Sequence, residues 1–257
     1  MFVTVFALAV LAWLYARGTR AVWRVAGRGR GVRSWQTVAF GAGLATLMVA
    51  LVSPLDGMSE QLFSAHMVQH LLLVAIAAPL IALGGPLLPL AWAWPRAARL
   101  GHGWARRGQM LASLPVAFGV HSLALWLWHT PVLYEGALRD DLLHATEHLA
   151  LLGTGLLFWS TAGAGLTRGG RGLGASVLYV FGIGAQCTGL GALIALANRP
   201  WYPLYGERSV AWGLSAMDDQ VLAGAIMWVP AGLVYLAFAL VLLGAWLRPL
   251  PRSAEQH

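Results

Sequence analysis

The stretch from residue 61 to residue 83, QLFSAHMVQHLLLVAIAAPLIAL, decides the fold of this chain. It is close to the length, about 20 predominantly apolar residues, that an α-helix needs to cross a bilayer. His66 and His70 lie four positions apart in it, so on a helix the two imidazoles face the same side. Ionisable side chains at membrane depth are costly and usually functional, and imidazole is the commonest metal ligand. The stretch therefore predicts a membrane-spanning helix that carries a functional histidine pair.

A second stretch of the same pattern follows later in the chain. His144-Ala145-Thr146-Glu147-His148 lies in the apolar stretch 142–163, and both strings fit the pattern H-x-x-[Q/E]-H. Gln69 and Glu147 occupy the variable polar position, beside their histidine pairs. Two helices can therefore each present two imidazoles to a shared interior.

The composition places the whole chain in the membrane. Of its 257 residues, 58% are hydrophobic and only 11% are charged, and the mean hydropathy is +0.67. These values lie outside the range of soluble globular domains. We expect an all-α integral membrane protein, in which residues 1–257 form one domain, a bundle of seven transmembrane helices. The predicted spans are 2–16, 35–52, 61–83, 112–130, 142–163, 173–196 and 219–247.

The net charge of +7 reflects membrane topology and not nucleic-acid binding. All 17 basic residues are arginines, and most of them follow the first, third, fifth and seventh predicted spans. The positive-inside rule then places the N-terminus outside and the C-terminus in the cytoplasm, with the basic loops facing anionic lipid. The arginines on the predicted cytoplasmic side are Arg17, Arg20, Arg24, Arg28, Arg30, Arg33, Arg96, Arg99, Arg106, Arg107, Arg168, Arg171, Arg248 and Arg252.

With this topology, polar residues gather in the outer third of the predicted bundle. At 1.5 Å per residue, His66 and His70 lie about 8 and 14 Å below the outer end of their span, and His144 and His148 about 3 and 9 Å below theirs. His129 ends the fourth span at the same boundary, and Asp219 begins the seventh. Candidate metal ligands at this depth are His66, His70, His129, His144, His148 and Asp219.

Other side chains near this layer suit an auxiliary role. Carboxylates and amides commonly hold the second nitrogen of a ligating imidazole, a role open to Glu147, Gln69 and Asp218. Met67 and Met217 add thioether sulfurs, which favour Cu(I) over hard cations. Met67 lies about 100° around the helix from His66, so lipid or a neighbouring helix is an alternative contact for it. Each histidine pair could also serve as a purely structural hydrogen-bonded strap between helices.

Several residues inside the spans are predicted to serve packing. His121 lies about 12 Å deeper than His129 on the same helix, which favours a packed core residue. The single cysteine, Cys187, sits among small residues of the sixth span. The glycines of that span predict close helix packing, and they include Gly182, Gly184, Gly189 and Gly191.

A series of ordered motifs resembles a known family. The series comprises Ser53-Pro54-Leu55-Asp56, His66 to His70, Gly84-Gly85-Pro86, Trp128-His129-Thr130-Pro131, His144 to His148, and Asp219-Gln220. Over residues 35–245 the chain is similar to the multi-span CtaG family of cytochrome c oxidase assembly proteins. The resemblance implies a multi-pass protein of the bacterial inner membrane that delivers copper to a haem-copper oxidase. Its implied partners are oxidase subunits and a periplasmic copper donor, and its implied ligand positions are the candidate ligands named above.

Three functions remain open on the residues alone. A metal-handling assembly factor, which is not an enzyme, would hold copper in an outward-facing histidine site and release it. A membrane zinc hydrolase is the main alternative, because His144 to His148 fits H-x-x-E-H, in which the glutamate activates metal-bound water. A b-type haem protein is the third, since histidines on two facing helices can ligate haem iron axially.

Overall fold

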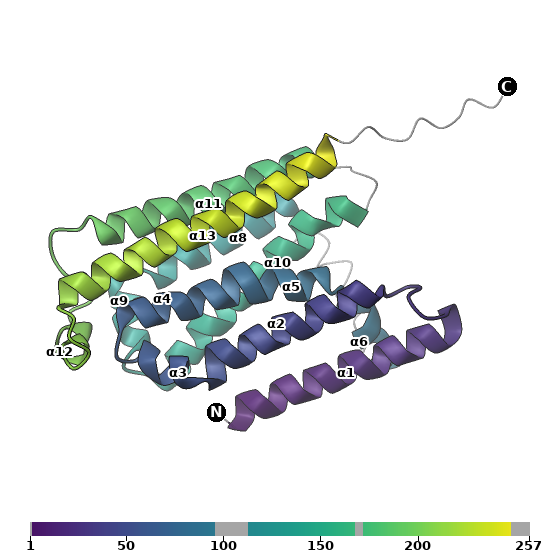
Figure 1. Cartoon of the computed structure of the whole chain (residues 1–257), viewed down its shortest axis with the longest axis horizontal. Helices are drawn as coiled ribbons and strands as arrows, with labels where there is room; N and C mark the ends of the chain where they lie inside the picture. Colours follow the sequence, from purple (N-terminus) through teal and green to yellow (C-terminus); the bar gives the residue numbers. More distant parts are fainter. Residues whose placement is uncertain (1, 96–112, 168–171, 248–257) are drawn as a thin grey trace.

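The computed structural model describes residues 2–95, 113–167 and 172–247, and every regular element in these ranges is a helix (Figure 1). The expected all-α fold is therefore confirmed. The long helices lie side by side along one axis, and the short helices α3, α9 and α12 cluster at one end of the bundle, which we call the α12 end. The helices are α1 (Phe2–Ala26), α2 (Ser34–Val52), α3 (Pro54–Ser59), α4 (Phe63–Leu71), the π-helical turn η1 (Leu72–Ala77), α5 (Ala78–Leu83), α6 (Leu87–Ala93), α8 (Leu114–Trp128), α9 (Pro131–Ala137), α10 (Asp141–Thr167), α11 (Leu173–Ala195), α12 (Tyr205–Val210) and α13 (Ala216–Trp246).

Five helical runs among the described residues are long and apolar enough to cross a membrane: α1, α2, the continuous run Phe63–Leu83, α11 and α13. Helices α8 and α9 meet at a 76° bend and add a sixth span if they are counted together. Helix α10 covers the predicted fifth span and is not among these runs. The chain is thus a helical protein with five or six candidate spans, and seven spans stay a prediction.

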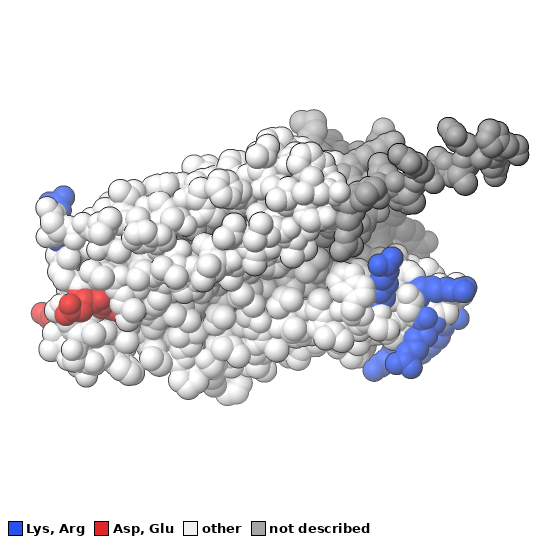
Figure 2. Space-filling view, turned by 45° about the horizontal axis from the view of Figure 1, so that its top comes forward, with Lys and Arg blue, Asp and Glu red and all other residues white. Residues whose placement is uncertain are grey.

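Charge is divided between the two ends of the bundle. Most described arginines gather at the end where α1 leads into α2, whereas the acidic side chains lie at the α12 end beside a smaller group of arginines (Figure 2). This division agrees with the charge pattern behind the predicted topology, although the orientation of the termini is still a prediction. The other arginines used in that prediction lie outside the described residues: Arg96, Arg99, Arg106, Arg107, Arg168, Arg171, Arg248 and Arg252.

The span that carries the first histidine pair changes its helical register directly after His70. Residues Leu72–Ala77 form a π-helical turn, in which the N–H of Ala78 bonds to the carbonyl of Leu73. The next residue, Pro79, has no N–H to offer the Val74 carbonyl, and the Trp159 indole on α10 donates to that carbonyl at 2.9 Å instead. This bond ties α10 to the histidine-bearing span just below the histidines.

Helices α11 and α13 make the most extensive contact of any two described helices. A Cβ atom on Gly224 would lie 2.5 Å from the Gly191 carbonyl oxygen, so the two backbones touch at this point. The expectation of close packing is confirmed for Gly182, Gly184 and Gly191, but it is wrong for Gly189. A Cβ atom on Gly189 would meet nothing within 4 Å, because that position is exposed.

Candidate metal centre

Helices α4 and α10 bring the two predicted histidine pairs together. His66 and His70 lie one turn apart on α4, and their ring centroids are 4.3 Å apart. His144 and His148 repeat this arrangement on α10, also at 4.3 Å. Between the helices, the His66 ring lies 5.2 Å from that of His144 and the His70 ring lies 5.5 Å from that of His148. The i, i+4 spacing had predicted each pair, and the packing of α10 against the Phe63–Leu83 span makes the pairs face each other.

Glu147 lies at the centre of these rings. Its carboxylate is fully buried, with Oε2 3.8 Å from His66 Nε2 and Oε1 3.7 Å from His70 Nε2. Neither oxygen has a hydrogen-bond partner among the described residues. Glu147 was predicted as an auxiliary residue, and the structure instead places it where a ligand would be. We call His66, His70, His144, His148 and Glu147 the histidine cluster.

The cluster carries several buried polar atoms without a partner in the described part of the chain. They are His70 Nδ1, His144 Nε2, His148 Nε2 and both oxygens of Glu147. Buried polar groups are normally hydrogen-bonded, so a group of unpaired ones points to an absent ligand. Two sets of donor atoms lie within 4.8 Å of one another, namely His66/His70/His148 and His66/His144/Glu147. Imidazole nitrogen and carboxylate oxygen are suitable ligands for Zn²⁺ and Cu²⁺, so these residues fit a metal ion.

His129 adds a third helix to the site. It follows the last residue of α8, where the chain bends before Pro131, and its ring centroid lies 5.6 Å from that of His70. Its Nδ1 donates to the Leu125 carbonyl at 2.7 Å, so the neutral ring keeps an unprotonated Nε2, and that atom is buried without a partner. A backbone carbonyl that fixes the tautomer in this way is typical of metal-ligating histidines.

Three tyrosines cover the histidine cluster at the α12 end, and the sequence analysis missed them as site residues. Tyr205 donates its hydroxyl proton to the Ser59 carbonyl at 3.0 Å, and its oxygen lies 3.3 Å from His66 Nδ1. Since a phenol has one proton, His66 Nδ1 donates to this oxygen, and His66 Nε2 keeps its lone pair. Burial raises the pKa of Tyr205 well above its usual value, so the phenol stays protonated.

The other two tyrosines support this arrangement. The Tyr134 hydroxyl lies 3.1 Å from that of Tyr205, and Tyr202 donates to the His129 carbonyl at 2.7 Å. Both side chains are almost completely buried. Their spacing in the sequence follows no helical or metal-binding pattern, because α9 supplies one and the segment between α11 and α12 the other.

Asp219 was predicted as a ligand, but the structure gives it a different task. Its Oδ2 accepts the Phe63 N–H at 2.7 Å, and its Oδ1 accepts both the N–H, at 3.0 Å, and the hydroxyl of Ser64. Asp219 therefore caps the start of α4, where the helix has unpaired N–H groups and a positive dipole end. Asp218, an expected auxiliary residue, forms a capping box with Ser215 at the start of α13 and is exposed.

The remaining auxiliary candidates also lie outside the cluster. The Gln69 amide donates to the Ala50 carbonyl at 2.8 Å and to Asp56 Oδ1 at 2.9 Å, so it ties α4 to α2 and α3. Met67 is buried in the apolar core together with residues of α11 and α13, which agrees with the alternative contact expected for it. Met217 is half-buried in the first turn of α13.

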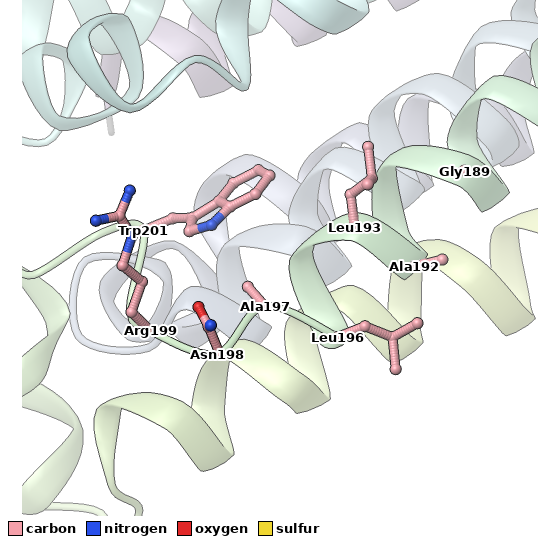
Figure 3. Close-up of a pocket in the computed structure, with 8 residues that line it drawn as sticks. All are labelled: Gly189, Ala192, Leu193, Leu196, Ala197, Asn198, Arg199 and Trp201. Carbon is pink, nitrogen blue, oxygen red and sulfur yellow. The ribbon is translucent and has the colours of Figure 1, made fainter.

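A surface groove lies near the α12 end but does not include the cluster. Figure 3 shows it between the end of α11 and Trp201, with Leu193, Asn198 and Arg199 among the residues around it. No residue of the histidine cluster lines this groove. Within the histidine cluster, the side chains of His66, His70 and Glu147 are buried, and those of His144 and His148 are half-buried.

Comparison with known families gives one match. The family model described as cytochrome c oxidase caa3 assembly factor matches residues 13–249, which is most of the chain. The match confirms the resemblance that the ordered motifs indicated. Comparisons with curated proteins and with solved structures give no match.

Proposed function

Since the chain belongs to the family of cytochrome c oxidase caa3 assembly factors, we propose that it holds copper in the histidine cluster and delivers it to the oxidase. Copper is the cargo in this proposal, and the protein performs no catalysis. The observation that carries it is the convergence of four imidazoles and a buried carboxylate, in which His70 Nδ1, His144 Nε2, His148 Nε2 and both Glu147 oxygens lack partners among the described residues. A metal ion bound here would give these unpaired atoms a partner.

The protein environment suits temporary binding. His66 and Glu147 are fully buried, whereas His144 and His148 are partly exposed at the edge of the site. We expect a cation to exchange through this edge, unlike an ion in a closed four-thiolate cage. The described residues place no cysteine in the cluster, since Cys187 lies in the apolar core with residues of α11 and α13.

The proposed membrane location of the histidine cluster bears on the choice of partner. The helices that carry it belong to a bundle whose long helices suit a membrane. A cation can therefore pass to another membrane protein without crossing the full membrane. Oxidase subunits are the partner that the family name supports, and a periplasmic copper donor would supply the site.

Metal content after copper loading tests the proposal. Protein purified in mild detergent should retain copper, and the double variant His66→Ala/His148→Ala should not, because both candidate donor sets lose a member. His121→Ala is the matched control: His121 is equally buried, but it bonds to Thr154 outside the cluster. Zinc retained in preference to copper would favour the hydrolase, and a Soret band would favour a haem protein.

The effect on the oxidase gives the second test. In a host strain at limiting copper, the same double variant should lower oxidase activity while the amount of the variant in the membrane stays normal. Excess external copper should partly restore activity, because mass action can bypass a delivery protein. Unchanged oxidase activity at limiting copper would contradict copper delivery.

A further inference from the structure

One nitrogen atom of the histidine cluster faces two different groups of donors. His66 Nε2 lies 2.8 Å from His70 Nε2 and 3.8 Å from Glu147 Oε2. The two donor sets, His66/His70/His148 and His66/His144/Glu147, have only His66 in common. An imidazole nitrogen has a single lone pair in the ring plane and can ligate one ion at a time. Occupation of one set through this nitrogen therefore excludes occupation of the other.

We propose that the cluster contains two overlapping cation sites that are filled in turn, with His66 as the ligand common to both. His66, His144 and Glu147 form the entry site, and His66, His70 and His148 form the storage site. This inference rests on the proposed function, and it adds the order in which the cargo meets the residues. The transfer is a ligand exchange: His144 and Glu147 leave the cation as His70 and His148 replace them, with no change of oxidation state.

The position of the residues sets the direction of the transfer. His144 lies in the first turn of α10 at the α12 end and His66 in the first turn of α4, whereas His148 and His70 lie one turn further along the same two helices. His148 lies one helical turn beyond His144, about 6 Å further along α10 at 1.5 Å per residue. A cation that enters at the α12 end therefore meets the entry site first.

Negative charge surrounds the entry side. Asp56, Glu60 and Asp141 all act electrostatically on His144, and the acidic surface at this end of the bundle is visible in Figure 2. Carboxylates at the mouth of a low-dielectric site raise the local concentration of cations and their association rate. The entry site is thus placed where cations collect.

The donor types favour movement toward the storage site. Imidazole is a better ligand for copper than carboxylate, which suits harder cations. The storage site has three imidazoles. The ring of His129 lies next to that of His70, and its Nε2 is buried without a partner among the described residues. The entry site has two imidazoles and Glu147. Copper should therefore bind more tightly in the storage site, while the entry site governs how fast it arrives.

Kinetics and affinity of Cu(I) binding separate the two sites. Full-length protein in mild detergent is mixed anaerobically with a chromogenic Cu(I) complex, and both the rate of copper transfer and its equilibrium are recorded. His144→Ala should slow loading by about tenfold or more while the affinity stays within about threefold of wild type. His70→Ala should load at nearly the normal rate but hold copper about tenfold or more weakly. His66→Ala should lower both, and His121→Ala should change neither.

A second pair of variants guards against loss of folding. Glu147→Gln keeps the size of the side chain and should repeat the slow loading of His144→Ala, whereas His148→Asn should repeat the weak binding of His70→Ala. Wild-type protein should bind one Cu(I) per chain. Equal effects of the entry and storage variants on rate and affinity, or two ions bound per chain, would overturn the two-site inference and leave copper binding intact. Absence of copper binding by wild-type protein would instead overturn the proposed function.

Discussion

Two helix contacts in this bundle differ in how closely the helix backbones approach and in what lies between them. Helices α11 and α13 make the most extensive contact of any two described helices, and they touch backbone to backbone at Gly191 and Gly224. Helix α10 instead packs closely on α5 and η1, but its backbone is separated from that of α4, where the imidazoles fill the space. The first contact is closed by small residues and leaves no room for a ligand. The second is held open by polar side chains, several of which have atoms without a hydrogen-bond partner among the described residues.

The comparison indicates a division between stability and function. A glycine-mediated contact gains dispersion energy from close backbones and needs no polar partners. A cluster of buried, unpaired donors and acceptors lowers the free energy of unfolding, and contacts elsewhere in the bundle offset this loss. Asp219 connects the two regions, because it belongs to α13 and caps α4.

The largest effect is expected in the glycine contact. Gly224→Ala would place a Cβ atom 2.5 Å from the Ala195 nitrogen and the Gly191 oxygen, both of which are backbone atoms that cannot move aside without separating the helices. We expect the amount of folded protein in the membrane to fall severely, as measured by detergent extraction and size-exclusion chromatography. Gly189→Ala on α11 is the matched control, because the new methyl group would meet nothing within 4 Å. Equal yields of the two variants would show that the contact between α11 and α13 does not depend on the close approach of their backbones.

The connection between the two regions comes next. Asp219→Asn replaces one acceptor by an NH₂ group, which faces a backbone N–H of α4 and leaves a buried donor unpaired, at a cost of about 1–3 kcal/mol in unfolding free energy. Denaturation of the purified variant measures this. The exposed Asp218→Asn should cost less. Copper affinity should change little in a folded Asp219→Asn sample, and loss of copper with unchanged stability would show that Asp219 is a ligand.

A smaller effect is expected where a tyrosine orients the cluster. Tyr205→Phe removes the oxygen that accepts the His66 Nδ1 proton, so the tautomer that leaves Nε2 free is no longer favoured. Copper affinity should fall about tenfold, since loss of such a partner commonly costs 10- to 100-fold. The variant should stay folded. Tyr235→Phe, which removes a buried hydroxyl in the apolar core with residues of α11 and α13, should leave copper affinity unchanged. The same affinity in both variants would remove Tyr205 from the site.

The smallest effect concerns Met67. It is buried among apolar residues of α11 and α13, so Met67→Leu conserves volume and should cost less than about 1.5 kcal/mol in stability. Copper affinity should equal that of wild type. A clear loss of affinity would mean that the thioether reaches the cation, and the cluster would then extend into the core.

The sequence was sufficient for the features that depend on local spacing. Four-residue spacing predicted both histidine pairs, and hydropathy predicted their helices. The role of Asp219 was not predictable in this way, because an aspartate near a span start can be a ligand or a cap, and only the tertiary structure shows which helix begins beside it. The tyrosines Tyr134 and Tyr205 were missed for the same reason, since they come from separate short helices and meet only when the bundle forms.

Copper binding by imidazoles of the histidine cluster can be measured by X-ray absorption spectroscopy at the copper edge, on wild-type protein loaded with one equivalent of Cu(I). We expect nitrogen ligands at about 2.0 Å with the outer-ring scattering of imidazole, and loss of this signal in His66→Ala/His148→Ala. A sulfur shell at about 2.3 Å, or an imidazole signal that persists in the double variant, would contradict it.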